Sequence, residues 1–411
     1  MKKRVCAAVL LSLMMLSGCG ARQSEVLRPS GAADAVELYA RASDGTFASA
    51  EYRFALELLR GALRTKENEN VMLSPYSVLQ ALGMTMNGAA GQTRTEAENL
   101  LIGTGHTIEE LNEYLYGWCG GQEPQNDACR LHTANCIWIN EQIRNVKDTF
   151  LQQNENYYAA EIRRSPFDSS ALREINGFVK KETDSMVPKI LDRLDPAAML
   201  VLVNAVCFDA KWASPYEKDQ ISDGSFTNAD GSSAAVQMMT GHETEYLEQN
   251  GAVGFLKYYA GQYAFAGILP PADVTVQEWL DAQTEESLIS MVSGRTAAAV
   301  TAVMPAFQAD TSVQLETLLP GMGMPSAFSD SADFSALSDE SLKIDEVVHK
   351  THIDVGAAGT KAAAATAVVM TKGALEVTGE QKTVRLDRPF VYMILDMTNE
   401  LPVFIGTVQT L

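Results

Sequence analysis

The sequence predicts an α+β fold in which early helices pack on large mixed or antiparallel β-sheets. Helical periodicity appears at residues 51–64, 75–87 and 172–191, all in the first half of the chain. Apolar and β-branched runs typical of strands lie mainly in the second half. Helices that precede strands, rather than alternate with them, disfavour a parallel sheet built from βαβ units. The strand-like runs occupy residues 131–139, 199–208, 262–269, 297–304, 343–355, 384–396 and 402–408.

The composition permits a large hydrophobic core. The chain has 411 residues, of which 46% are hydrophobic, and no linker interrupts it after about residue 46. We therefore expect one domain over residues 47–411. The formal net charge of −20 disfavours nucleic acid as a partner and disfavours adhesion of the folded body to an anionic membrane. Such a self-repelling surface is typical of a soluble protein, and we expect a monomer.

The stretch MKKRVCAAVLLSLMMLSGCG at the start of the chain differs from the rest. Basic residues at 2–4 precede an apolar run too short to span a bilayer comfortably, and small residues precede Cys19. The sequence LSGC at 16–19 is similar to the lipobox of bacterial lipoproteins. This resemblance implies a signal peptide over residues 1–18 and a lipid on Cys19. An ordinary secretory signal and an uncleaved anchor are the alternatives.

Residues 19–46 are small, polar and weakly patterned, which is typical of a flexible spacer between a lipid and a folded domain. We expect the protein to work outside the cytoplasm, at the bacterial cell surface or in the extracellular space. It would then touch the membrane only through the N-terminal lipid, because more than one acyl chain gives stable anchoring.

The cysteines beyond the signal show no metal-ligand spacing. Cys119 and Cys129 bracket a polar stretch, where they either pair in an oxidising compartment or remain free thiols. Cys136 and Cys207 lie in apolar runs, where a cysteine usually acts as a small buried hydrophobe.

No catalytic or metal-binding constellation is recognisable. The sequence has no G-x-S-x-G elbow and no phosphate-binding glycine loop, and His242-Glu243 lacks the second histidine of an H-E-x-x-H motif. His349 and His352 are three residues apart in a strand-like run, so their side chains are expected on opposite faces. We therefore expect a protein that is not an enzyme and that uses no metal or cofactor. The acidic composition argues against a heparin-like polyanion as a cofactor.

A series of ordered stretches shares the motifs of one protein family. In NVMLSPYSVLQALGMTMNGAAGQT (70–93), Ser74 is a helix N-cap and Pro75 takes the first helical position. This stretch resembles the second helix of the serpins and its glycine-rich exit. The chain from about residue 47 to its end is similar to a serpin, which implies the serpin fold. The further stretches, in the family's order, are INGFVKKETDSMVPKIL, LVLVNAVCFDAKW, MPAFQ, GMGMPSAFSDSADFSAL, EVVHK and VRLDRPFVYMI.

The resemblance places an exposed reactive centre loop at about residues 357–383. Serpins inhibit serine proteases as suicide substrates: the protease cuts the loop, forms an acyl-enzyme, and is distorted when the cut loop inserts into the main sheet. In an inserted strand the side chains of Thr360, Ala362, Ala364 and Thr366 share one face without a charge. The hinge of this loop comprises Gly359, Thr360, Lys361, Ala362, Ala363, Ala364, Ala365 and Thr366.

Other residues match family positions that control the opening of the main sheet. The resemblance implies that Ser74, Ser77, Asn204 and His349 form a hydrogen-bonded shutter, and that Trp212 lies where the loop first enters. Acidic residues usually precede the hinge glycine in this family. This chain has Ala357 and Ala358 there, and the missing charge is expected to loosen the upper end of the loop.

The target protease follows from the scissile bond, for which two positions remain open. The usual loop length implies cleavage between Gly373 and Ala374, whereas a loop shorter by one residue is cut after Lys372. Lysine suits trypsin-like enzymes, and glycine followed by alanine suits elastase-like or subtilisin-like enzymes. A non-inhibitory serpin that acts as a binding or chaperone module, and a cross-class inhibitor of cysteine proteases, are the alternatives.

Overall fold

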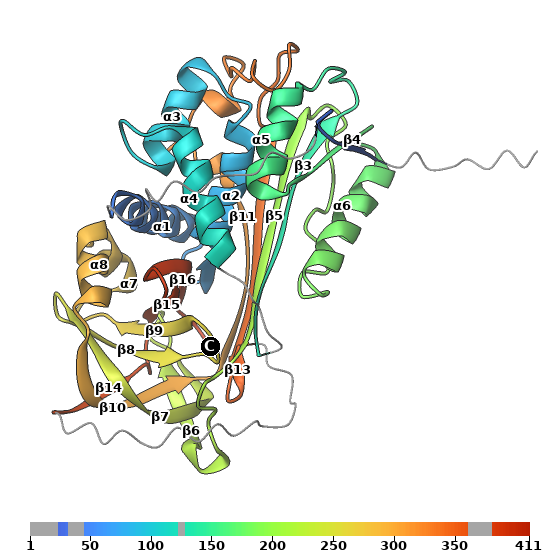
Figure 1. Ribbon diagram of the computed structural model, residues 1–411. Coiled ribbons are helices and arrows are strands. Elements are labelled where there is room, and N and C mark those ends of the chain that lie inside the picture. Colours follow the sequence, from blue (N-terminus) through green and yellow to red (C-terminus); the bar gives the residue numbers. More distant parts are fainter. Residues whose placement is uncertain (1–23, 32–44, 122–127, 361–379) are drawn as a thin grey trace, which may run out of the picture.

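The computed structural model describes residues 24–31, 45–121, 128–360 and 380–411. Figure 1 shows a long, narrow sheet that runs the length of the molecule, a second sheet at one end, and helices gathered mainly beside the long sheet. This arrangement confirms the α+β fold class predicted from the sequence. Among the described residues no helix is long and apolar enough to cross a membrane.

The long sheet, called sheet A here, is mixed. Most neighbouring strands are antiparallel, but β5 pairs in parallel with β12 and β3 in parallel with β4. In the described residues its strands are, in spatial order, β1 (Glu25–Leu27), β4 (Glu161–Ser165), β3 (Cys129–Asn140), β5 (Leu200–Lys211), β13 (Gly359–Thr360), β12 (Glu346–Gly356) and β11 (Phe307–Gln314).

The second sheet, sheet B, is largely antiparallel and closes one end of the core. Among its described strands only β14 joins in parallel, beside β10. Its described strands are, in order, β14 (Gln381–Arg385), β10 (Thr296–Pro305), β7 (Ser233–Gln249), β8 (Ala252–Tyr258), β9 (Tyr263–Leu269), β15 (Phe390–Asp396), β16 (Leu401–Val408) and β2 (Val71–Leu73), with β6 (Ile221–Thr227) beside β7.

Helices cover both faces of sheet A. The helix α2 is buried along its whole length, with Ser74 as its N-cap and Pro75 in its first turn, as the sequence predicts. The helix α6 covers the opposite face, where a smaller apolar cluster fills the space beneath it. The helices are α1 (Thr46–Thr65), α2 (Pro75–Met86), α3 (Gly91–Leu101), α4 (Ile108–Gly121), α5 (Asp148–Tyr158), α6 (Ser169–Glu182), α7 (Val276–Asp281) and α8 (Glu285–Ser293), with short 3₁₀ turns at Lys218–Gln220, Leu315–Thr317 and Ser326–Phe328.

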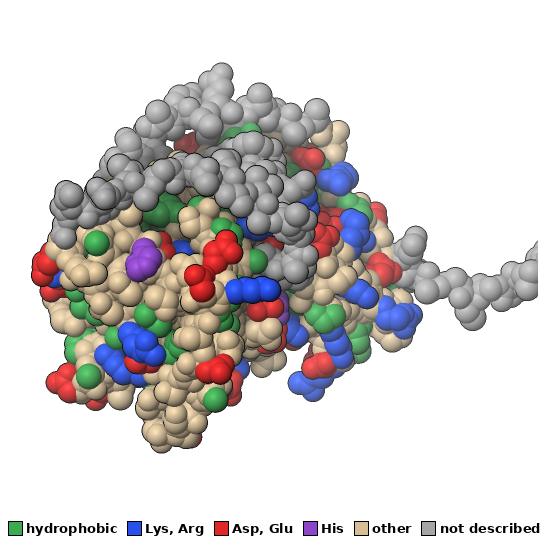
Figure 2. Space-filling model, turned by 90° about the horizontal axis from the view of Figure 1, so that it is seen from below, with side chains coloured by type: hydrophobic (Ala, Val, Ile, Leu, Met, Phe, Trp, Pro, Cys, Tyr) green, Lys and Arg blue, Asp and Glu red, His purple; other side chains and the backbone are tan. Residues whose placement is uncertain are grey.

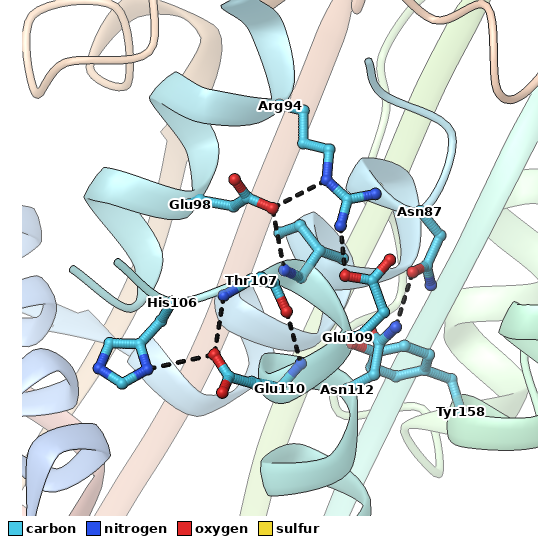
Figure 3. A network of polar contacts seen from close by, with 10 residues as sticks. Asn87, Arg94, Glu98, His106, Thr107, Glu109, Glu110, Asn112 and Tyr158 are labelled. Atoms are coloured by element: carbon cyan, nitrogen blue, oxygen red, sulfur yellow. Dashed lines mark hydrogen bonds and ion pairs between the residues drawn. The ribbon is translucent and has the colours of Figure 1, made fainter. Parts of the chain in front are cut away.

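A polar network fastens α5 to α2 and α4 (Figure 3). The Tyr158 hydroxyl donates to Asn112 Oδ1 at 2.6 Å, and Asn112 Nδ2 donates to Asn87 Oδ1 at 2.7 Å. On the solvent side Arg94 pairs with Glu98 and Glu109, which joins α3 to α4. Asn112 is fully buried, so its two hydrogen bonds fix the spacing of these helices.

Alternation along β5 divides the core into two parts. Leu200, Leu202 and Phe208 face the main core between the sheets, whereas Val201 and Val203 face α6. A strand that is apolar on both faces is typical of a central position in a sheet. The continuous apolar run in the sequence therefore arises from burial on both sides.

Several predicted element boundaries differ from the structure. The helix predicted over 172–191 ends at Glu182, because Asp184 and Ser185 adopt positive φ angles that a helix does not tolerate. The run 384–396 forms two strands with different partners, interrupted before Phe390, where Pro389 has no N–H for a ladder.

The spacer expected over residues 19–46 is also not wholly free of structure. Residues Glu25–Leu27 form β1 and extend sheet A by pairing with β4. Ser24 donates from its backbone N–H to Glu174 of α6 at 3.1 Å, and Glu25 forms an ion pair with Arg164 at 2.6 Å. Polar contacts with charged side chains of the domain thus hold this segment. Hydrophobic periodicity does not detect such contacts, so the sequence analysis missed this strand.

Candidate functional site

Sheet A is closed along most of its length and forked at one end. In the closed part, called the seam here, Val201–Cys207 of β5 pair directly with Glu346–His352 of β12. Beyond the seam, β13 lies between the same two strands, with Thr360 opposite Ala210 on one side and Val355 on the other. The first described residues of the predicted hinge therefore already occupy the fork.

Glycine at the fork is required by close packing. Gly359 has φ 151°, and a Cβ atom there would lie 2.1 Å from the Ala210 carbonyl oxygen. No side chain fits at that distance, so the hinge glycine allows the backbone of β13 to approach β5. Thr360 follows with its side chain fully buried, and its hydroxyl is 2.7 Å from the Tyr259 hydroxyl.

Trp212 lies directly under the turn that joins β12 to β13. Its indole Nε1 donates to the Gly356 carbonyl at 2.9 Å, and its backbone N–H donates to the Ala358 carbonyl at 3.0 Å. The Tyr216 N–H donates to the Ala357 carbonyl at 2.9 Å. Hydrogen bonds from Trp212 and Tyr216 thus hold three successive carbonyls.

The structure brings together four of the predicted site residues beneath the seam: Ser74, Ser77, Asn204 and His349. The Ser74 N–H donates to His349 Nε2 at 3.1 Å, and its Oγ accepts from the Ser77 N–H at 3.2 Å. His349 Nδ1 contacts Asn204 Oδ1, and Asn204 Nδ2 donates to the Ser77 hydroxyl at 2.6 Å. Asn204 and His349 also face each other in the strand register. Their side-chain contact therefore bridges the two strands of the seam.

Burial keeps His349 neutral. Its Nε2 accepts from a backbone N–H, so the ring proton is on Nδ1, which donates to the carbonyl oxygen of Asn204. Desolvation lowers the pKa of His349 from 6.5 to about 3. The imidazole therefore acts as a fixed donor and acceptor across the seam, and protonation would remove its acceptor.

The network extends to residues that the motif comparison missed. Asn135 of β3 accepts from Asn204 Nδ2 at 2.6 Å and donates to Gln80 Oε1 at 2.9 Å. A polar residue inside the apolar run ANCIWIN was the signal that could have found Asn135. Tyr259 and Lys257, which line the fork, gave no such signal. They lie in or directly after a strand-like run, where a tyrosine or a lysine is unexceptional.

Several predicted site residues lie outside the described residues. They include the lipidation candidate Cys19, the scissile-bond candidates Lys372, Gly373 and Ala374, and the hinge residues Lys361, Ala362, Ala363, Ala364, Ala365 and Thr366. The thiol of Cys129 is buried and forms no disulfide, and burial raises its pKa to about 12; the side chain of Cys119 lies outside the described part of the structure.

Charge and ligand chemistry at the described surface are unremarkable. No group of three or more potential ligand side chains among the described residues could hold a metal ion. On the face shown in Figure 2, acidic and basic side chains are interspersed over the described surface, without a broad basic patch. The fork and the network beneath the seam are therefore the distinctive features of the fold.

The sheet topology, the helix pattern and the forked sheet A together define a serpin fold. The chain belongs to the serpin family: the family model described as serpin (serine protease inhibitor) matches residues 49–411. Members of this family generally inhibit serine proteases rather than act as enzymes, although some serpins are non-inhibitory.

Relatives and solved structures agree with this assignment. Serpin A3-7 of Bos taurus is 30% identical over 373 residues, which cover 88% of each chain. An uncharacterized serpin-like protein of Thermococcus kodakarensis is 29% identical, covering 82% of this chain and 80% of the relative. The native state of the thermophilic serpin tengpin has a TM-score of 0.87 at 37% identity, covering 95% of this chain and all of tengpin. Its latent state has a TM-score of 0.77 at 35% identity, covering 90% of this chain and 98% of the other.

We expect Asn204→Ala to lower the free energy of unfolding by about 3 kcal/mol, because it leaves buried groups of His349 and Ser77 without partners. Equilibrium urea unfolding followed by tryptophan fluorescence measures the change. Asn99→Ala, at an exposed position of α3, is the matched control and is expected to stay within about 0.5 kcal/mol of the wild type. Equal stabilities of the two variants would contradict a role for Asn204 across the seam.

The lowered pKa of His349 predicts a loss of stability in mild acid. Below pH 6.5 the unfolded chain binds a proton at His349 that the folded chain does not. The free energy of unfolding therefore decreases as the pH is lowered. Relative to His349→Gln, the wild type is expected to lose about 2 kcal/mol between pH 6.5 and pH 5. Urea unfolding of both proteins across this range tests the prediction, and parallel pH profiles would refute it.

Proposed function

We propose that this chain inhibits serine proteases that act outside the cytoplasm, as a suicide substrate. The protease serine attacks a carbonyl at residues 372–374, the peptide bond breaks, and the new amine leaves with a proton. The ester that remains links the enzyme to the amino-terminal part of the loop. Insertion of that part between β5 and β12 then carries the enzyme away and distorts it before water cleaves the ester.

The register at the fork is the observation that carries this proposal. β13 is antiparallel to both β5 and β12, with Thr360 opposite Ala210 and Val355. Continued in the same register, each residue further along the loop pairs one residue further back on both strands. Thr366 then falls opposite Asn204 and His349.

This register places a hydroxyl where one is needed. Insertion separates Asn204 from His349, and each would lose a buried partner. Thr366 shares the face of Thr360, whose side chain is buried in the core. A threonine at this position offers both a donor and an acceptor between the two separated side chains.

The other hinge residues are also compatible with a position between β5 and β12. Ala362 and Ala364 share the core face and add little volume beneath a sheet that is already well packed. In an inserted strand Lys361 would lie on the opposite face, away from the main core. About a dozen new backbone hydrogen bonds at about 1 kcal/mol each would supply a drive on the order of 10 kcal/mol.

The place of action rests on the start of the chain. The basic residues, the short apolar run and LSGC before residue 20 support cleavage ahead of Cys19 and lipidation of its sulfur. The segment held by sheet A begins at Ser24, so only a few residues would separate lipid and domain. The inhibitor would then face trypsin-like, elastase-like or subtilisin-like proteases at the cell surface.

A panel of these three protease types tests the inhibitory function. We expect at least one to form a complex with the 20–411 protein that survives denaturing electrophoresis. Thr360→Arg is expected to lower the trapped fraction at least about tenfold and to turn the protein into a substrate, because Thr360 occupies a fully buried position where an unpaired charge is not tolerated.

Gln381→Arg is the matched control, since Gln381 is exposed on the far side of the loop and the substitution adds the same charge. It should trap as the wild type does. Cleavage by every protease without a stable complex would favour a non-inhibitory serpin, and a complex only with a cysteine protease would favour cross-class inhibition.

Cleavage within residues 372–374 is also expected to stabilise the protein. Because the cut loop adds a strand to sheet A, the melting temperature should rise by at least about 10 °C. Calorimetry of intact and cleaved protein measures the shift, with cleaved Thr360→Arg as the comparison that should gain little. An unchanged melting temperature would show that sheet A gains no strand.

A further inference from the structure

An ammonium group is buried next to the fork. Lys257 of β8 is 3% exposed, and its Nζ lies 2.9 Å from Glu243 Oε1 and 3.1 Å from the Ser214 carbonyl. The same Nζ lies over two rings, 4.2 Å from the centroid of Tyr216 and 5.4 Å from that of Trp212. Every partner except Glu243 belongs to one short segment, Trp212–Tyr216, called the cradle here.

The cradle has little regular structure of its own. Apart from an isolated bridge between Trp212 and Tyr259, it forms no strand or helix, and residues 213–215 are exposed. It nevertheless supplies all three hydrogen bonds to the carbonyls of Gly356, Ala357 and Ala358. Three kinds of contact hold the cradle: Trp212 stacks on Tyr259, the Ala213 N–H donates to the Tyr258 carbonyl at 3.0 Å, and Lys257 contacts two rings and one carbonyl. Among these, Lys257 is the contact that reaches both ends of the segment.

The surroundings are shaped to hold this cation. A Cβ on Gly241 would lie 2.9 Å from Glu243 Oε1 and 3.1 Å from a ring carbon of Tyr216, so glycine makes room for both partners. A buried ion pair usually stabilises a fold no better than well-packed apolar residues, and breaking it is costly. The buried charge of Lys257 is therefore better explained by the positions it gives to its contact partners than by a gain in stability.

We propose that Lys257 is a positioning residue that fixes the register in which the cut loop enters sheet A. This inference rests on the proposed inhibitory function. The cradle anchors the turn at Ala357 and Ala358, and the turn sets Thr360 opposite Ala210. All later pairs follow from that first pair.

Register matters here because a slip by one residue reverses the face of every side chain. Lys361 would then enter the main core, and Thr366 would leave the gap between Asn204 and His349. A loop that enters in mixed register inserts more slowly, and the acyl-enzyme has more time to hydrolyse. Lys257 thus acts on trapping and not on recognition of the loop by the protease.

Cys207 provides a direct probe of the register. Its thiol forms no disulfide and is buried on the face of β5 toward α6, and in the proposed register it would lie opposite residue 363. In Ala363→Cys protein, cleavage of the loop followed by mild oxidation should give a bond between residues 207 and 363, identified by peptide mass spectrometry. Ala364→Cys, with its side chain on the other face, is the matched control and should give none.

Lys257→Met, made in both cysteine backgrounds, tests the proposal. We expect the ratio of the 363 to the 364 crosslink to fall about tenfold, as for the loss of one charged hydrogen bond. The stoichiometry of inhibition should rise while the rate of loop cleavage stays unchanged. Lys257→Arg should restore both, because it keeps the charge near Glu243.

The outcomes separate the two proposals. Absence of both crosslinks and of any protease complex in the Lys257 background overturns insertion itself, and with it the role of Lys257. A crosslink ratio and stoichiometry unaffected by Lys257→Met overturn the role of Lys257 alone. If Lys257→Met fails to melt cooperatively, Glu243→Gln, which removes only one partner of the cation, is measured in its place against the same two readouts.

Discussion

The direct pairing of β5 with β12 is the constraint on which the structure depends. These strands are parallel neighbours along the seam, yet β13 already lies between them at the fork, antiparallel to both. A strand inserted between them would replace one parallel ladder by two antiparallel ladders, which are slightly more stable per residue. In the proposed mechanism the seam is therefore the place where parallel hydrogen bonds would be exchanged for antiparallel ones.

The polar network beneath the seam explains how a sheet with this alternative stays closed. A seam held only by apolar contacts would part gradually, since such contacts are not directional. Asn204 and His349 instead form a buried contact that is either made or lost, at a cost of several kcal/mol while no replacement is present. In the proposed insertion, Thr366 would reach the level of Asn204 and His349 and would offset that cost only after the preceding hinge residues had entered the sheet.

Fold and site were predictable from the sequence to different degrees. Ser74 and Pro75 mark the start of α2 by local capping chemistry, and the family motifs pointed to Asn204 and His349, which meet beneath the seam, and to Trp212, which lies at the fork. The division of 384–396 into two strands depends on partners distant in sequence, which periodicity does not report. Lys257 was missed for the same reason, because an ordinary strand lysine becomes a buried cation only through tertiary contacts.

Ala357 and Ala358, which replace the acidic residues usual in the family, show that tertiary contacts can alter the effect expected from a sequence difference. The missing acidic side chains led to the expectation of a looser loop end. In the structure the carbonyls of Ala357 and Ala358 accept hydrogen bonds from Tyr216 and Trp212, whatever their side chains. The charge near this turn lies instead on Lys257, beneath the cradle and paired with Glu243. A backbone anchor with a buried cation behind it thus holds this turn without an acidic side chain at residue 357 or 358.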